Sequence, residues 1–137
     1  MAFVKSNNGK LPFLTMALKD AAPLALQIRL FTNNQTPTTS DTILNYSELT
    51  THGYAARDIP RSTWYVSLDS QGNTNAVADN VVFVLDGTGA DVTVYGYTIT
   101  YNIGTQSYLI GAEQFLLPLN LSSAGGTITV TPTITEQ

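Results

Sequence analysis

Short runs of alternating apolar and polar residues, separated by turns rich in glycine, asparagine and aspartate, fill most of the chain after residue 24. Side chains of a strand point alternately to its two faces, so each run predicts a strand with one buried face. About seven short strands joined by turns at short intervals predict an all-β fold, an antiparallel β-sandwich that is jelly-roll-like or immunoglobulin-like. The runs span residues 24–31, 64–69, 80–85, 92–101, 107–115 and 127–131.

The run over residues 92–101 is the longest and is rich in aromatic and β-branched residues. Turn residues 102–105 connect it to the run at 107–115, which predicts a hairpin. Gly96 lies in its middle, and a glycine inside a strand often marks a gap where another backbone approaches closely.

Two segments do not follow the strand pattern. One short helix is expected over residues 43–49, where Asp41 or Thr42 is placed to cap it. Residues 1–23 alternate short apolar patches with asparagine, glycine and lysine, and show no sustained helical or strand period. We therefore expect an extended N-terminal arm over residues 1–23, which packs on a neighbouring subunit, and one β-sandwich domain over residues 24–137.

Charged residues are few and unevenly placed. They make up 12% of the sequence, too few for a solvated helical bundle, while the 43% of hydrophobic residues is too many for a disordered chain. Residues 1–61 hold all six basic and four acidic residues, and residues 62–137 hold six acidic residues and no basic one. Nucleic acid is therefore not an expected partner, because its binding depends on basic side chains that neutralise phosphates. The opposite charges of the two parts favour contacts between subunits.

The composition also excludes several kinds of site. The chain has no cysteine, hence no disulfide, thiolate metal site or thiol nucleophile, and its single histidine cannot form a two-histidine metal site. No apolar run approaches the roughly 20 residues that span a bilayer. The apolar residues 11–18 make a poor signal peptide, because Lys19 and Asp20 follow at once. We expect a soluble, unprocessed protein without membrane contact and without a cofactor.

No group of residues predicts catalysis. His52 lies in a loop segment near Ser47 and Glu48, but the chain has no nucleophile elbow, so we interpret His52 as a surface or turn residue. Residues 86–91 are rich in oxygen ligands and glycine. They lack the spacing of a calcium loop and the third glycine and lysine of a phosphate loop, so they are interpreted as an ordinary turn. The protein is not expected to be an enzyme.

Three tyrosines of the longest run lie at positions i, i+2 and i+6, which places Tyr95, Tyr97 and Tyr101 on one strand face. Burial in the sandwich core is the favoured interpretation, because alternating aromatic residues of a central strand normally pack inward. The alternative is an exposed surface that stacks on sugars or contacts another subunit.

Several short landmarks occur in order between residues 24 and 135. They are Leu30-Phe31-Thr32-Asn33-Asn34 with Thr36-Pro37, Gly53-Tyr54-Ala55-Ala56, Val94-Tyr95-Gly96-Tyr97 and Gly111-Ala112-Glu113-Gln114-Phe115. In this order they resemble a group of small structural proteins of tailed-phage virions. The resemblance implies a β-sandwich subunit on the particle, either a head decoration (cement) protein or a tail component, and it carries no catalytic residue.

Two functions are therefore expected. The first is a non-enzymatic capsid decoration protein, located in the virion and favoured to be a homotrimer, which binds the major capsid protein lattice and stabilises the head. The alternative is a phage tail or fibre module that binds host surface polysaccharide, with exposed tyrosines and Trp64 as stacking platforms. The expected subunit or partner contacts come from the arm and the tyrosine face, namely Phe3, Val4, Lys5, Leu11, Phe13, Leu14, Tyr95, Tyr97 and Tyr101.

Overall fold

The computed structural model describes residues 2–18 and 25–136. The described residues form an all-β fold of antiparallel sheets with one α-helix, which confirms the predicted fold class. The strands are β1 (Val4–Lys5), β2 (Leu26–Phe31), β3 (Arg57–Ile59), β4 (Tyr65–Leu68), β5 (Thr74–Val77), β6 (Val81–Leu85), β7 (Val92–Ile103), β8 (Gln106–Leu121), β9 (Gly126–Val130) and β10 (Thr133–Glu136). The α-helix is α1 (Lys10–Leu18), and 3-10 helices span Asn7–Gly9, Ile43–Asn45 and Arg61–Thr63.

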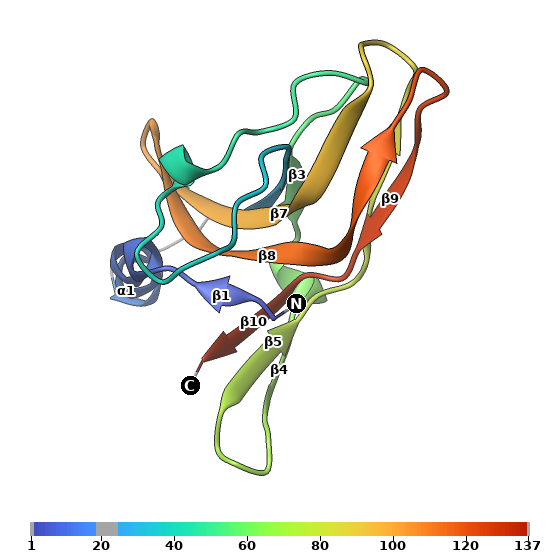
Figure 1. Cartoon of the computed structure of the whole chain (residues 1–137). Helices are drawn as coiled ribbons and strands as arrows, with labels where there is room; N and C mark the ends of the chain where they lie inside the picture. Colours follow the sequence, from blue (N-terminus) through green and yellow to red (C-terminus); the bar gives the residue numbers. More distant parts are fainter. Residues whose placement is uncertain (1, 19–24, 137) are drawn as a thin grey trace.

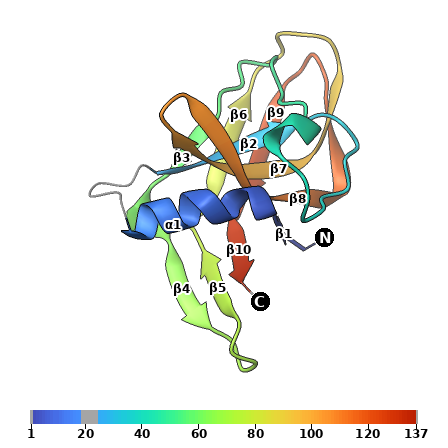
Figure 2. The ribbon, with the colours of Figure 1, turned by 90° about the vertical axis from the view of Figure 1, so that its left-hand side faces the viewer.

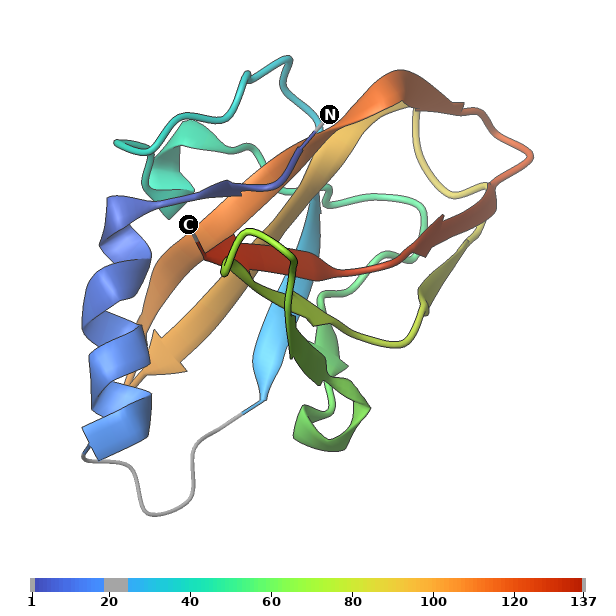
Figure 3. The ribbon, with the colours of Figure 1, turned by 90° about the horizontal axis from the view of Figure 1, so that it is seen from below.

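The strands make three sheets. A five-stranded sheet has the order β1-β8-β7-β2-β3, a three-stranded sheet has the order β10-β5-β4, and β6 pairs with β9. The long strands β7 and β8 curve together across the molecule (Figure 1). Seen from below, β10 and its neighbours lie across one face of this pair, with α1 to one side (Figure 3).

The core lies between the five-stranded sheet and the two smaller sheets. Alternation along β2 turns Leu26, Ile28 and Leu30 inward, where they meet side chains of β6, β9 and β10. Phe31 and Leu109 pack in a second, smaller cluster together with Tyr46 and Ala112. The large side chains of the main core are Leu26, Ile28, Leu30, Leu49, Ile59, Val81, Phe83, Leu85, Val94, Tyr97, Ile99, Tyr101, Ile110, Leu121, Ile128, Val130 and Ile134.

The helical segments differ from the prediction. The helix expected over residues 43–49 is only the 3-10 helix Ile43–Asn45, which Thr42 caps as expected. The chain then returns to β2, where Glu48 forms a bridge with Phe31, so the helix cannot continue. The α-helix lies instead at Lys10–Leu18, inside the predicted arm. Its sequence is apolar almost all round, so it lacks the polar face that makes a helical period visible.

The first residues of the predicted arm pack on the chain's own sheet. Val4 and Lys5 pair with Ala112 and Gly111 of β8. The ring of Phe3 stacks on Tyr97 with 6.3 Å between ring centroids. Residues 2–5 thus line one edge of the five-stranded sheet. Residues 19–23 of the predicted arm lie outside the described residues, and contact with a neighbouring subunit stays a prediction.

The loop after β2 is organised around the buried carboxylate of Asp41. This carboxylate accepts hydrogen bonds from the backbone N–H of Thr38 at 3.1 Å, the hydroxyl of Thr38 at 2.6 Å, the hydroxyl of Tyr46 at 2.7 Å and the side-chain amide of Gln35 at 3.3 Å. Burial alone raises the pKa of Asp41, but the hydrogen bonds from Thr38 and Tyr46 outweigh burial and hold the pKa below its ordinary value.

Candidate functional site

Strands β4 and β5 form a ribbon that projects from the body of the fold (Figure 2). The side chains of Tyr65, Val66 and Leu68 in β4 are 70%, 68% and 71% exposed, although all three are large and apolar. Val77 lies opposite Tyr65 in β5 and is partly exposed. These four residues are called the ribbon surface. Their exposure on both faces of the ribbon is typical of a contact that another molecule covers.

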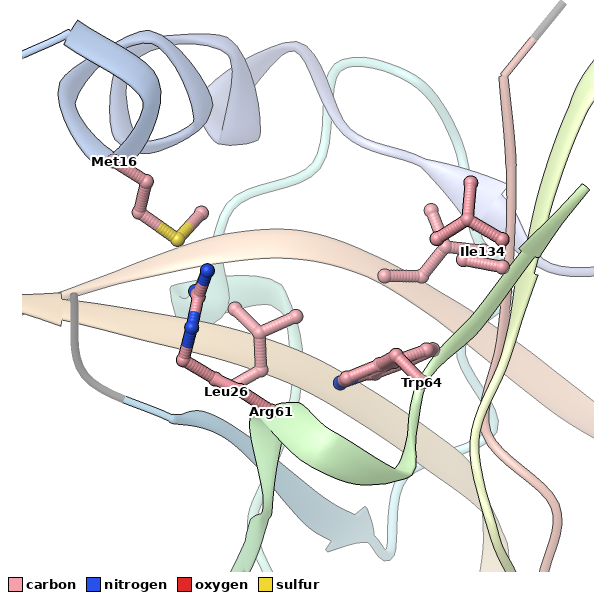
Figure 4. Close-up of a pocket in the computed structure, with 7 residues that line it drawn as sticks. Met16, Leu26, Arg61, Trp64 and Ile134 are labelled. Atoms are coloured by element: carbon pink, nitrogen blue, oxygen red, sulfur yellow. The ribbon is translucent and has the colours of Figure 1, made fainter.

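A pocket of about 440 Å³ opens at the base of the ribbon, facing α1 (Figure 4). Among the described residues that line it, only Arg61 is charged, and its guanidinium makes no hydrogen bond or ion pair with any of them or with another described residue. Trp64, the predicted stacking residue, is partly buried in the pocket wall. The pocket therefore combines apolar walls with one unpaired cation. The other lining residues are Met16, Leu26, Val66, Ala76 and Ile134.

Local interactions hold the ribbon in shape without a partner. At its base, the hydroxyl of Thr63 donates to the carbonyl of Pro60 at 2.8 Å and closes the turn into β4. At its tip, Asp69 accepts from the backbone N–H of Asn73 at 2.9 Å, and Gly72 supplies a φ of +85°. The hydrogen bonds from Asn73 keep the pKa of Asp69 below its ordinary value. The ribbon surface is thus presented by a preformed hairpin.

Strand β4 is also an edge strand, since it lies at the end of the order β10-β5-β4. Edge strands are normally protected by charged residues, proline or a cover. The sequence Tyr65–Leu68 holds no charged residue and no proline. This edge is therefore short but carries neither the charged residues nor the proline that usually hinder pairing with another chain.

A second exposed apolar surface lies on β8. Val94 of β7 pairs with Leu119 of β8, and Gly96 pairs with Gln114. The four residues 115–118 of β8 therefore lie opposite the single residue Tyr95 of β7 and form a β-bulge. Pro118 has no N–H to donate to a neighbouring strand, which favours the break in pairing. Leu116 and Leu117 are 80% and 76% exposed, and Leu119 is 41% exposed. Leu116, Leu117, Pro118 and Leu119 are called the bulge surface.

The same bulge separates the three tyrosines. Tyr97 and Tyr101 are buried in the main core, as predicted, and the hydroxyl of Tyr97 donates to Glu113 at 2.9 Å. Burial, reinforced by the charge of Glu113, raises the pKa of Tyr97. Tyr95 is only partly buried and packs on the second cluster, on the other side of the sheet. The prediction of one common face is therefore wrong for Tyr95, because the irregular register next to it breaks the alternation.

The remaining predicted contact residues lie in α1. Leu11 is 56% exposed, so its side chain is available for a contact. Phe13 and Leu14 belong to the same helix, but the structure describes only their backbone and not their side chains. Neither the ribbon surface nor the bulge surface was among the contacts expected from the sequence.

His52 lies in a turn, as one of the two interpretations held, but it is fully buried and so is not a surface residue. Its φ of +61° is in the left-handed region. Its backbone N–H donates to the carbonyl of Thr88 at 2.7 Å, and its carbonyl accepts from Asp86 at 2.8 Å. In its ring, Nδ1 shares a hydrogen bond with the hydroxyl of Thr51, while Nε2 has no partner among the described residues. His52 therefore joins two loops rather than facing a substrate.

The loop at residues 86–91 is a turn, as predicted. The carboxylate of Asp86 accepts hydrogen bonds from the backbone N–H and the hydroxyl of Thr88, which lower its pKa. Among residues 2–18 and 25–136, no three histidine or carboxylate side chains gather as metal ligands. The described helix is also too short to cross a bilayer.

Replacing His52 with alanine is expected to lower the free energy of unfolding by about 2–4 kcal/mol. The substitution leaves a cavity and removes the hydrogen bond between the ring and Thr51, whereas the Cβ that histidine already carries at this left-handed backbone position stays. His52→Gly leaves a similar cavity but accepts the positive φ, so it should cost about 1 kcal/mol less than His52→Ala. Urea unfolding followed by Trp64 fluorescence measures both. Equal stability of His52→Ala and the original chain would contradict the assigned joining role.

No protein-family model, no curated protein and no solved structure matches the chain. The ordered landmarks therefore stay a resemblance. The part of the chain that the structure describes thus has two exposed apolar surfaces and an apolar pocket whose Arg61 has no partner within that part.

Proposed function

We propose that the chain is a non-enzymatic structural subunit of a tailed-phage virion, a decoration protein that binds the major capsid protein lattice and stabilises the head. The observation that carries this proposal is the exposure of the ribbon surface and the bulge surface. Isolated proteins rarely group large exposed apolar side chains, so surfaces of this kind call for a protein partner. The sequence landmarks favour a virion as the place where that partner is found.

A repeating lattice suits contacts of this size. Each surface consists of four residues, so a single contact buries much less than the roughly 800 Å² per partner of a standard interface. Many copies on one lattice, or several linked in an oligomer, add such weak contacts into stable attachment. A preformed hairpin also loses little conformational freedom on binding.

The alternative is a tail or fibre module that binds host surface polysaccharide. Trp64 in the open pocket and the exposed ring of Tyr65 favour it, since sugars stack on aromatic faces. Sugar sites also need several hydrogen-bonding groups, and the described side chains that line this pocket are apolar except for Arg61. Protein contact therefore remains the preferred function.

Binding to purified capsids tests the proposal. The chain is expected to co-sediment with capsids of the phage that encodes it, to saturate at a fixed copy number, and to raise the temperature at which the capsids rupture. Capsids that already carry the chain are the matched control and should bind no more. Binding to host polysaccharide without any binding to capsids would overturn the proposal in favour of the tail or fibre module.

A further inference from the structure

We propose that the bulge surface of one copy docks into the pocket at the base of the next copy's ribbon, so that copies of the chain join head to tail into a closed ring. The inference rests on the proposed function only in taking both surfaces as protein contacts. It assigns a second copy of this chain as the occupant of the pocket.

Shape supports this pairing. The bulge surface exposes two adjacent leucines, Leu116 and Leu117, where the pairing of β8 with β7 is irregular. Removing one leucine side chain from a protein core leaves a cavity of about 150 Å³. The pocket volume of about 440 Å³ thus exceeds what one leucine side chain needs, and its apolar walls include Trp64, Val66 and Ile134.

Charge supports the same pairing and opposes the symmetric one. Arg61 at the pocket has no acidic partner among the described residues. Asp91 is exposed and directly precedes β7, three residues or about 10 Å from Val94, which pairs with Leu119. It likewise has no partner among the described residues. Docking the bulge into the pocket brings Asp91 of one copy toward Arg61 of the next. Pairing each surface with itself would instead bring like charges together.

Contact between two different surfaces repeats from copy to copy. Such head-to-tail contacts close into a ring when the rotation between copies allows it, and otherwise grow into a filament. Two copies joined by one small contact bind each other weakly. Closing the ring adds one more contact within the same assembly, so no further copy loses translational and rotational freedom. We therefore expect monomers in equilibrium with one closed ring, a trimer if the decoration-protein hypothesis holds.

Engineered cysteines test the contact directly, because the chain has no cysteine of its own. A mixture of the single variants Val66→Cys and Leu117→Cys is expected to form a disulfide-linked pair on mild oxidation, whereas neither variant alone should do so. Leu44→Cys is the matched control, since Leu44 is 92% exposed but lies outside both surfaces. The double variant Val66→Cys with Leu117→Cys should give a circular trimer on a non-reducing gel.

Two results would overturn the inference. Rapid cross-linking of Val66→Cys with itself would mean that the ribbons pair two by two. A mixture that reacts no faster than mixtures containing Leu44→Cys would mean that the two surfaces do not meet. Both measurements use the purified chain without capsids. Loss of the ring with capsid binding intact thus counts against this inference alone, and a ring that binds no capsid counts against the proposed function alone.

Charge reversal provides an independent test by sedimentation velocity. Arg61→Glu and Asp91→Arg are each expected to weaken assembly about three- to tenfold per contact, and the two together should restore it. Lys10→Glu makes the same charge change as Arg61→Glu on an exposed residue away from both surfaces and should have no effect. A combined variant that assembles more weakly than either single variant would rule out the proposed pairing of the two charges.

Discussion

Replacing Gly96 with alanine is expected to lower the free energy of unfolding by about 2–3 kcal/mol, as overpacking of a filled interior does. A Cβ at this position would lie 2.6 Å from Cζ of Phe31 and closer still to the carbonyl oxygen of Glu113. The ring belongs to a buried cluster and the carbonyl belongs to the paired strand, so neither is free to move. Urea unfolding measures the loss.

Two further variants make the Gly96 prediction specific. Gly126→Ala is the matched control, because a Cβ there meets only Leu121 at 3.7 Å, and it should change stability by less than about 0.5 kcal/mol. Gly96→Ala should cost less in a Phe31→Leu background, where the ring is gone, but the carbonyl of Glu113 prevents full recovery. Equal costs in the two backgrounds would contradict the assigned contact with Phe31.

Replacing Asp41 with asparagine is expected to cost about 2–3 kcal/mol at pH 7, because one carboxylate oxygen becomes an N–H₂ group that faces buried donors. The hydroxyl of Tyr46 and the N–H and hydroxyl of Thr38 then compete for too few acceptors. Asp69→Asn is the matched control, since its donors lie in an exposed turn, and it should cost less.

The cost of Asp41→Asn should depend on pH. The pKa of Asp41 is lower in the folded chain than its reference value of 3.8, so its contribution to stability is fully present above that value. The contribution is lost as pH falls through the folded pKa. The stability difference between the original chain and Asp41→Asn should therefore narrow below about pH 4. A difference that stays constant from pH 7 to pH 3 would contradict the role of the charged carboxylate.

The sequence was sufficient to predict the strands that have one buried and one more exposed face. Residues 26–31 and 81–85 alternate buried and more exposed side chains, and both runs were predicted as strands. Strands β1, β3, β5 and β10 were missed because each has only two to four residues, too few to show a period. Helix α1 was missed for another reason: its own residues are apolar on nearly all sides, so its sequence shows no helical period.

The candidate surfaces were harder to predict, and for different reasons. The run at 64–69 alternates like a half-buried strand, but β4 lies at the edge of a projecting ribbon, where tertiary structure leaves both faces exposed. For the bulge surface a signal was present: Leu116, Leu117, Pro118 and Leu119 form an unbroken apolar run that violates alternation. His52 was misjudged because its burial depends on a loop more than 30 residues away.

The exposed side chains of the ribbon are separate from the packing that holds this small chain folded. Tyr65, Val66 and Leu68 contribute little to the buried core, so substituting them should leave folding almost unchanged. If the ribbon surface is a contact, as proposed, a new set of side chains on β4 would change what it binds while the rest of the fold stays as it is. For the same reason the hairpin is a suitable place for the display of engineered peptides.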